Sequence, residues 1–179
     1  SVARDLGIET VFQDLALCPH LDPVRNLYLG REVRKRGPLG WFGFMDNKMM
    51  REKSSDAFAD LGATVRALSV PVGDMSGGQK QSVAVARAAS WANKIIFLDE
   101  PTAALGVVQT QNVLDLIKRV RDKGIGVVFI SHSMPEVLGV ADRVQVLRRG
   151  RRVATYQAAD TSLEELVGAM TGALDEEAV

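Results

Sequence analysis

Short apolar runs alternate with longer amphipathic stretches along this chain. Runs rich in β-branched and aromatic residues predict strands at residues 8–12, 95–99 and 126–130. Apolar residues that recur at helical spacing predict helices at 46–61 and 106–123. Strands that alternate with helices predict an α/β fold with a parallel sheet. The strand run at 95–99 is continuously apolar up to Asp99, which is typical of a strand buried on both faces.

The stretch between the first two strands differs, because prolines and glycines interrupt it. Pro23 near a first turn predicts a short helix at 22–31, and a face of small residues predicts another helix at 79–91. On the second helix, we expect Arg87 to be a surface or subdomain-bridging charge. Residues 37–44 form a glycine-rich aromatic loop, for which a cofactor or membrane role stays open. We expect packing onto the neighbouring helices instead, since the loop is short and broken for a segment that spans or lies in a bilayer. The last third predicts a helix at 134–141, a hairpin of strands 144–147 and 153–156, and a helix from Ser162 to Met170.

Composition narrows the class of protein. The chain has 179 residues, enough for one domain with a substantial core, and its 46% hydrophobic and 25% charged residues are typical of a globular protein. The formal net charge is zero, which argues against a predominantly electrostatic nucleic-acid binder. The single cysteine, Cys18, allows no internal disulfide and favours a reducing compartment. No apolar run approaches the length of a membrane span.

Two polar motifs stand out against this background. The second strand ends in Asp99 and Glu100, and ligands of open α/β sheets collect at the carboxyl ends of such strands. Residues 76–79 read Ser-Gly-Gly-Gln at a helix start, where free N–H groups and the dipole suit a phosphate and glycines allow close approach. Ser76 with Gln79 is equally a capping box that needs no ligand, and a carboxylate pair after a strand could simply begin a loop.

Taken together, the motifs resemble those of the ABC-type ATPases. Residues 76–79 match the signature motif, and 95–100 match the Walker B strand with its following glutamate. Three further landmarks stand in family order: Gln13 after the first strand, the D-loop segment 103–106, and His132 after the third strand. The resemblance covers essentially the whole chain. The amino-acid sequence at 9–17, 99–106 and 167–172 is similar to that of the ribose, xylose and fructose importers in this family.

The resemblance implies a P-loop NTPase core that uses ATP and Mg²⁺. In that family pattern Asp99 would hold Mg²⁺ through water, Glu100 would polarise the attacking water, and Gln13 would reach both. His132 would hydrogen-bond the γ-phosphate.

The signature motif has a different role in the same pattern. Ser76, Gln79 and the backbone of Gly77 and Gly78 would serve the nucleotide of the opposite subunit. Activity would therefore require a dimer, formed with a second ATPase subunit or half.

The resemblance also divides the chain and suggests partners. Residues 1–14 would end the first part of the ATPase core, 15–92 would form an inserted helical subdomain with the signature motif, and 93–179 would complete the core. The helical subdomain would dock on transmembrane permease subunits at the cytoplasmic face of the cell membrane. A periplasmic or extracellular sugar-binding protein would act indirectly, and no nucleic-acid partner is expected.

Two features depart from the family pattern. Ala103 and Gly106 replace the usual Ser and Asp of the D-loop, so we expect backbone contacts to replace side-chain contacts across the dimer. No Gly-x-x-x-x-Gly-Lys-[Ser/Thr] phosphate loop occurs in these residues, and the first residue is Ser, so we expect an N-terminally truncated, incomplete core. These residues alone should bind ATP poorly and hydrolyse it negligibly, and unpaired strand edges should favour self-association or marginal stability.

Two other functions stay open. One is a soluble ABC ATPase that acts on nucleic acid or ribosomes, but such proteins usually have long coiled-coil or basic insertions, whereas the insertion here is short. The other is a non-catalytic remnant that binds a permease without turnover. The presence of Glu100 and His132 argues against this second alternative.

Overall fold

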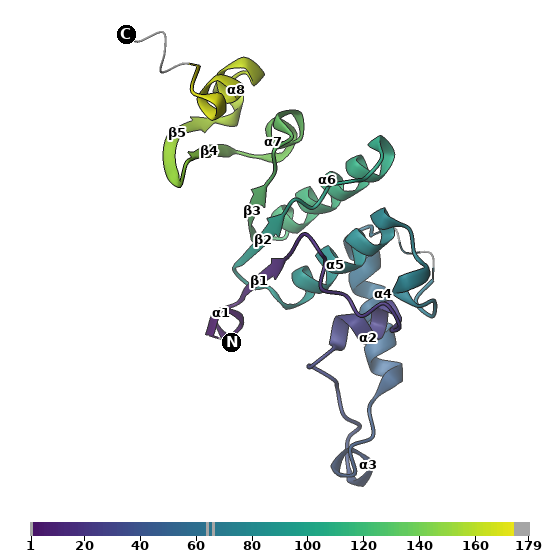
Figure 1. The fold of residues 1–179 in the computed structure, drawn as a ribbon. Coiled ribbons are helices and arrows are strands. Elements are labelled where there is room, and N and C mark those ends of the chain that lie inside the picture. Colours follow the sequence, from purple (N-terminus) through teal and green to yellow (C-terminus); the bar gives the residue numbers. More distant parts are fainter. Residues whose placement is uncertain (1, 64, 66, 174–179) are drawn as a thin grey trace. The chain divides into compact units, whose positions relative to one another are not determined.

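The computed structural model describes residues 2–63, 65 and 67–173, and the chain divides into two compact units (Figure 1). The first unit comprises residues 1–130 and the second residues 131–179, and each is described by itself. The predicted helical segment 15–92 therefore lies within the first unit. The residues at 174–179 belong to the last predicted segment and lie outside the described residues.

A parallel sheet forms the centre of the first unit. It contains β1 (Ile8–Val11), β2 (Ile95–Asp99) and β3 (Gly126–Ile130) in the order β1-β2-β3. The register places Val11 opposite Leu98 and Leu98 opposite Phe129. The predicted α/β fold with a parallel sheet is confirmed, and all three strands end at the same edge.

Two helices, α5 (Gly77–Trp91) and α6 (Val107–Asp122), pack against the sheet and each other. The side chains of Val11, Ile96 and Leu98 are almost completely buried beneath them. Ile95 and Phe97, which alternate with these residues on β2, are only half-buried. The expectation that β2 is buried on both faces is therefore only partly met, since Ile96 and Leu98 are buried whereas Ile95 and Phe97 keep part of their surface exposed.

The remaining elements of the first unit are mostly helical. They are α1 (Val2–Asp5), α2 (Pro23–Tyr28), α3 (Pro38–Trp41), α4 (Asn47–Asp60) and a 3₁₀ turn, η1 (Val72–Asp74). Asp22 caps α2 by accepting from the Arg25 N–H at 2.8 Å, and Asp46 caps α4 by accepting from the Met49 N–H at 3.1 Å. Helices α2, α4 and α5 pack together around buried residues such as Leu27 and Phe58.

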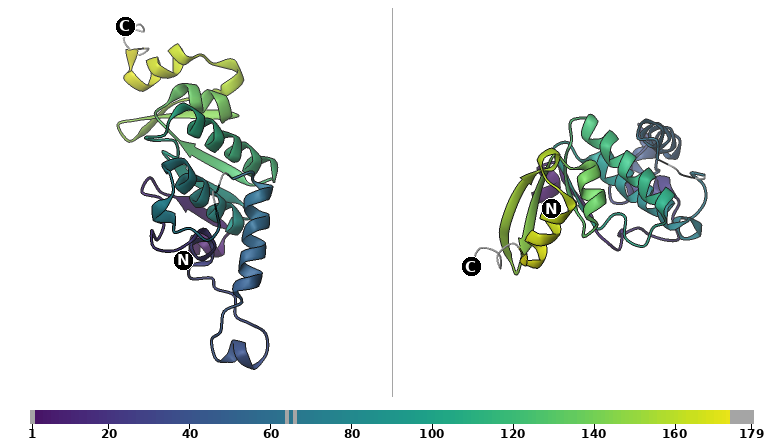
Figure 2. Two further views of the ribbon diagram at one scale, coloured as in Figure 1. Left: turned by 90° about the vertical axis from the view of Figure 1, so that its right-hand side faces the viewer. Right: turned by 90° about the horizontal axis from the view of Figure 1, so that it is seen from above.

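The aromatic loop at 37–44 is the clearest difference from the sequence prediction. We expected it to pack onto neighbouring helices, but the side chains of Trp41 and Phe42 are 86% and 74% exposed. The loop forms the tip of a paired segment that projects from the helices, with the one-turn helix α3 at its end (Figures 1 and 2). The packing prediction was wrong because this pairing holds the aromatic residues away from the helices.

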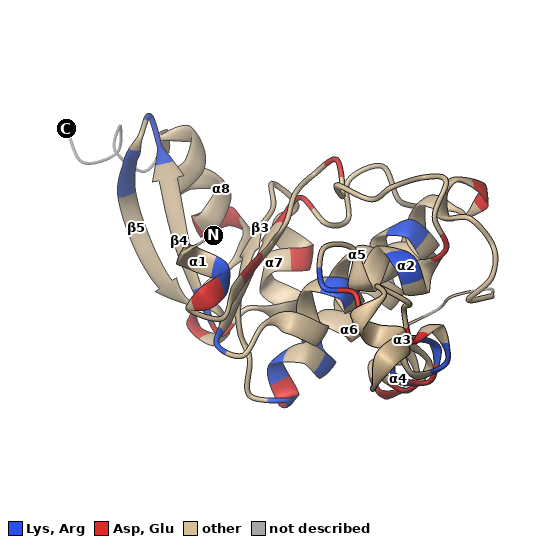
Figure 3. Ribbon diagram, turned by 90° about the horizontal axis from the view of Figure 1, so that it is seen from below, with Lys and Arg blue, Asp and Glu red and all other residues tan. Residues whose placement is uncertain are grey.

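The second unit contains a hairpin and flanking helices. Its elements are α7 (Met134–Val140), β4 (Arg143–Arg148), β5 (Arg151–Gln157), the 3₁₀ turn η2 (Ala158–Asp160) and α8 (Leu163–Thr171). The β4–β5 turn places Arg149 and Gly150 at φ of 50° and 75°, the signs that a two-residue hairpin turn requires. Basic residues gather at this turn (Figure 3). Across the described residues of both units, no helix has the length and apolar content needed to cross a bilayer.

Candidate functional site

The carboxyl edge of the sheet brings two of the predicted site residues together. Because Val11 pairs with Leu98, the residues that follow β1 emerge beside the end of β2. Gln13 and Asp99 line one pocket of about 570 Å³, together with Phe12, Asp14 and Ala16. The amide and carboxylate groups of this pocket supply oxygen atoms, which are the ligands that Mg²⁺ prefers.

Glu100 follows β2 directly and has an unusual backbone conformation. Its φ is 47°, in the left-handed region that residues other than glycine rarely occupy. Its N–H donates to the carbonyl of Ile130 at 2.9 Å, and its own carbonyl accepts from the Ala103 N–H at 3.2 Å. These two bonds tie the residue to the end of β3 and to the segment that follows, so the chain turns sharply just where the strand ends.

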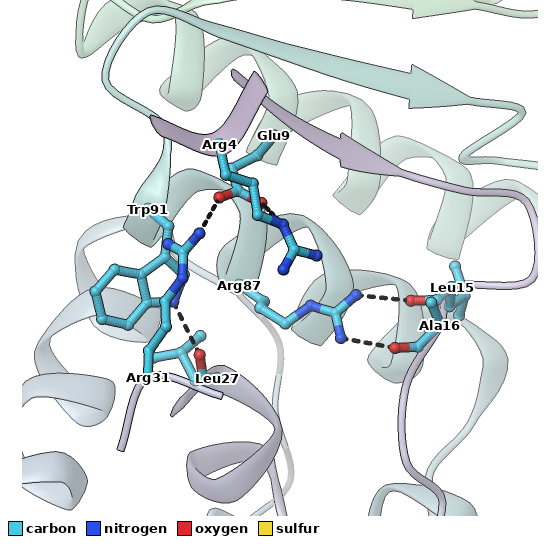
Figure 4. A network of polar contacts seen from close by, with 8 residues as sticks. All are labelled: Arg4, Glu9, Leu15, Ala16, Leu27, Arg31, Arg87 and Trp91. Carbon is cyan, nitrogen blue, oxygen red and sulfur yellow. Dashed lines mark hydrogen bonds and ion pairs between the residues drawn. The ribbon is translucent and has the colours of Figure 1, made fainter. Parts of the chain in front are cut away.

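The loop after Gln13 is strained in the same way. Leu15 and Ala16 have φ values of 62° and 45°. Arg87 on α5 donates to both carbonyls, at 3.0 Å from Leu15 and 2.7 Å from Ala16 (Figure 4). Burial is the main cause of a lowered pKa for Arg87, although a guanidinium stays charged at neutral pH. Arg87 thus ties the helix behind the signature motif to the loop that follows Gln13. Both acceptors lie within the predicted segment 15–92, so these bonds do not test the expected subdomain-bridging role.

A second group of contacts in the same region anchors β1 to the helices. Glu9 on β1 forms ion pairs with Arg31 at 2.6 Å and with Arg4 at 3.8 Å. The Arg31 guanidinium lies 4.7 Å from the centre of the Trp91 ring, and the Trp91 indole N–H donates to the Leu27 carbonyl at 2.8 Å (Figure 4). These contacts connect β1, α2 and the end of α5, so they fix the sheet relative to the helices inside the first unit.

The signature motif forms the N-terminus of α5. Ser76 accepts from the Gln79 N–H at 3.4 Å, and the Gln79 side chain accepts from the Ser76 N–H at 3.3 Å, so the capping box is present. A Cβ on Gly77 would lie 3.3 Å from Leu105, and one on Gly78 would lie 2.9 Å from Gln109. The glycines therefore let the helix approach the segment after Glu100 closely. Of the described residues that line the Gln13–Asp99 pocket, none belongs to the signature motif.

His132 belongs to the second unit and is described with that unit alone. Its side chain is exposed, and it stands just before the N-terminus of α7. The neighbouring Ser133 N–H donates to the Ser131 hydroxyl at 3.0 Å. The role predicted for His132 stays a prediction. Sequence reasoning missed the contacts of Leu15 and Ala16 with Arg87, because no sequence signal marks a leucine or an alanine for a left-handed conformation.

The residues present fit part of a Mg²⁺–ATP site. Within the described ranges, no group of three or more His, Cys, Asp or Glu side chains could hold a metal ion by itself. Asp99 and Gln13 could supply oxygen ligands to an ion whose remaining ligands are phosphates and water, as is usual for Mg²⁺. The phosphate loop is not among these 179 residues.

Comparison with known proteins decides the family. The family model for the ABC transporter matches residues 3–103, more than half of the chain. The chain belongs to the ABC transporter family. This ABC chain is 46% identical over 173 residues to the "Fructose import ATP-binding protein FrcA" of Rhizobium meliloti. The aligned region covers 96% of the chain and 66% of FrcA. It is 41% identical over 169 residues to the "Xylose/arabinose import ATP-binding protein XylG" of Sulfolobus acidocaldarius, with 94% of the chain and 65% of XylG covered.

The fold of this ABC chain also matches a solved cassette. The dimeric post-hydrolysis structure of the ATP-binding cassette MJ0796, bound to ADP and Pi, aligns with a TM-score of 0.69 and 26% sequence identity. The alignment covers 88% of this chain and 65% of MJ0796. The predicted family and α/β cassette fold are therefore confirmed. The chain spans slightly less than two thirds of the length of FrcA and XylG.

Proposed function

We propose that this chain is the catalytic part of an ATP-hydrolysing subunit that drives sugar uptake through an ABC importer. The observation that supports this most directly is the sheet edge, where Gln13 and Asp99 share a pocket and Glu100 turns sharply at the end of β2. The sugar-import assignment rests on the printed names of FrcA and XylG. A permease and a binding protein would select the particular sugar.

The proposed chemistry assigns a separate task to each residue at the edge. Bound Mg²⁺–ATP supplies the phosphoryl group and neutralises the charge that develops on it. Asp99 and Gln13 would hold the ion, partly through water, while Glu100 orients and polarises the attacking water. His132 would donate a hydrogen bond to the terminal phosphate.

The signature motif would act across a dimer. Ser76, Gln79 and the N–H groups of Gly77 and Gly78 would bind the nucleotide held by the opposite subunit. This agrees with their absence from the Gln13–Asp99 pocket among its described lining residues. The dimeric state of MJ0796 supports the same arrangement.

We propose that the subunit works at the cytoplasmic face of a membrane. Its helical segment, residues 15–92, would dock on transmembrane permease subunits, and a sugar-binding protein would act on the permease from the other side. Residues 1–14 and 93–179 would belong to the ATPase core.

The first test replaces Glu100 in the full-length protein. Glu100→Gln keeps the shape of the side chain but removes its charge, so kcat for ATP hydrolysis should fall about 100-fold or more. The Kd for ATP should change by less than about threefold, because the carboxylate acts on water. Glu164→Gln, the same change at an exposed position on α8, is the matched control and should leave kcat unchanged. Full activity of Glu100→Gln would reject the assigned role.

A second test concerns these 179 residues alone. Without a phosphate cradle they should bind Mg–ATP only weakly, because that loop provides most phosphate contacts in this family. Calorimetric titration should show no binding in the micromolar range, and hydrolysis should be negligible. Micromolar affinity would refute this part of the proposal.

A further inference from the structure

The segment at residues 31–46, here called the aromatic arm, is an ordered projection of the first unit (Figure 2). Its two sides pair as an antiparallel ribbon: the Lys35 N–H donates to the Phe44 carbonyl at 2.9 Å, and the Asp46 N–H donates to the Val33 carbonyl at 2.7 Å. Gly37 and Gly43, at φ of 76° and 85°, make the turns on either side of α3. The arm is therefore a folded feature that presents its tip in a fixed form.

The tip exposes a cluster of large apolar side chains. Leu39, Trp41, Phe42 and Phe44 are 51%, 86%, 74% and 57% exposed. The rings of Trp41 and Phe42 pack on each other with their centres 5.7 Å apart. Single exposed apolar residues are ordinary, but a contiguous cluster at the end of a projection marks a surface that binds something.

The backbone of the tip satisfies many of its own hydrogen bonds. The N–H groups of Gly40, Phe42, Gly43 and Phe44 donate to carbonyls within the tip at 3.0–3.1 Å. Gly40 is buried against the Lys35 backbone, where a Cβ would overlap the Lys35 carbonyl oxygen. A tip with paired N–H groups can leave water at a lower cost than an open loop, because unpaired amides are expensive in an apolar phase.

Positive charge lies directly behind this apolar tip. Arg34, Lys35 and Arg36 are consecutive and exposed, and no acidic residue occurs between Val33 and Met45. Basic residues next to exposed Trp and Phe are typical of segments that lie at the interface of an anionic bilayer. In that arrangement the rings enter the headgroup region and the cations meet lipid phosphates.

We propose that the aromatic arm binds an anionic phospholipid surface, with Trp41, Phe42 and Phe44 in the interface and Arg34, Lys35 and Arg36 on the headgroups. A stable protein interface takes about 20–30 residues from each side, more than the 16 residues of the arm supply by themselves, and binding that requires a permease is kept as an outcome of the test. This inference does not depend on the ATPase assignment, since the arm contains none of the residues placed in that site.

The main experiment is vesicle co-sedimentation of the full-length protein. The protein should bind vesicles of phosphatidylglycerol and phosphatidylcholine, and should bind pure phosphatidylcholine vesicles much more weakly. The double variant Trp41→Ser/Phe42→Ser should lose about tenfold or more in affinity. Both side chains are exposed, so the melting temperature and ATPase rate should stay unchanged.

Matched charge variants separate the arm from general electrostatic attraction. Lys35→Gln/Arg36→Gln removes two charges from the arm, and should weaken binding by about tenfold or more. Arg151→Gln/Arg152→Gln removes two charges from the β4–β5 hairpin, where basic residues lack an aromatic cluster, and should leave binding unchanged. Equal losses for the two double variants would overturn the proposal.

Lipids brominated on their acyl chains test the position of the tip directly. They should quench the fluorescence of the parent protein more strongly than that of Trp41→Phe, because Trp41 contacts the bilayer. The proposal is overturned if quenching is equal in the two proteins, if the parent fails to bind anionic vesicles, or if binding occurs only when vesicles contain a permease.

Discussion

Left-handed backbone conformations concentrate around the sheet edge. Of the five non-glycine residues with positive φ in the described chain, four are Leu15, Ala16, Glu100 and Ala104. Each such conformation costs about 1–3 kcal/mol, and persists only where neighbouring contacts hold it. Here those contacts include Arg87 for the first two residues and the end of β3 for Glu100. The strain is consistent with a site that is shaped before its ligand arrives.

Arg87 provides a test of this interpretation at a single residue. Arg87→Gln removes the charged donor that spans the Leu15 and Ala16 carbonyls, so the loop bearing Gln13 should relax. We expect kcat for ATP hydrolysis to fall about tenfold, since small displacements of positioning groups have effects of this size or larger. Stopped-flow or steady-state kinetics on the full-length protein would measure it.

Two controls accompany the Arg87 variant. Arg25→Gln removes an exposed arginine whose ion pair with Asp22 spans 3.9 Å, and should change nothing, because such surface pairs contribute little. Arg87→Lys should recover only part of the rate, because an ammonium lacks the planar fork that reaches both carbonyls. An unchanged kcat in Arg87→Gln would mean that the loop keeps its form without this bridge.

Residue-scale features were only partly predictable from sequence. Gln13, Asp99 and Glu100 could be located, because each lies at or just beyond the end of an apolar strand and the carboxyl ends of parallel strands share an edge. The bridge from Arg87 could not be predicted, because its acceptors are backbone carbonyls more than seventy positions away and carbonyls have no sequence signature. Such contacts depend on how the helix packs, which local patterns do not encode.

At the scale of elements, capping chemistry predicted helix starts well. Asp46, Ser76 and Ser162 cap their helices as the sequence indicates, and Asp22 caps α2, whose start was predicted from Pro23 instead. The aromatic arm was misjudged, because its apolar composition is equally compatible with a packed loop and an exposed tip. Only the ribbon pairing of its two sides distinguishes these arrangements, and that pairing is not a periodic pattern.

The capping box of α8 gives a prediction for stability. The Glu165 carboxylate accepts from the Thr161 hydroxyl at 2.7 Å and the Ser162 N–H at 3.1 Å, and these bonds hold the pKa of Glu165 below its usual value. A depressed folded pKa stabilises the folded state above the unfolded pKa, near 4.3, and this contribution is lost as the pH falls through the folded pKa. Glu165→Gln should therefore melt below the parent at pH 7, and the difference should shrink in acid.

Circular dichroism melts at pH 7 and at about pH 3 would measure this difference. Glu164→Gln is the neighbouring control, because it removes a carboxylate from the same helical turn and keeps both bonds of the Glu165 carboxylate. Ser162→Ala removes the other half of the box and should cost about 1 kcal/mol at either pH. A Glu165→Gln difference that is independent of pH would contradict the cap as the cause.

At the scale of the whole molecule, the proposed ATP hydrolysis depends on two copies acting together. Each composite site would combine the sheet edge of one subunit, with Asp99 and Glu100, and the signature helix start of the other. In the first unit the signature glycines pack near Leu105 and Gln109, and no described signature residue lines the Gln13–Asp99 pocket. Ser76 and Gly77 are exposed, as the proposed contact with a partner's nucleotide requires.

Mixed dimers of the full-length protein test that claim most directly. Gly77→Asp places a negative charge at the signature, in a backbone position without positive φ and at a helix start that suits an acid. The Leu105 side chain, 3.3 Å from the new Cβ, must shift by a few tenths of an ångström to make room. If the motif acts across the dimer, a Gly77→Asp subunit paired with a Glu100→Gln subunit keeps one composite site intact. That site joins the unaltered sheet edge of the first subunit to the unaltered motif of the second. A Gly77→Asp/Glu100→Gln subunit paired with an unaltered one leaves none. We predict that ATP hydrolysis, measured on doubly tagged heterodimers, persists in the first pairing and is lost in the second; activity in the second pairing alone would contradict the account.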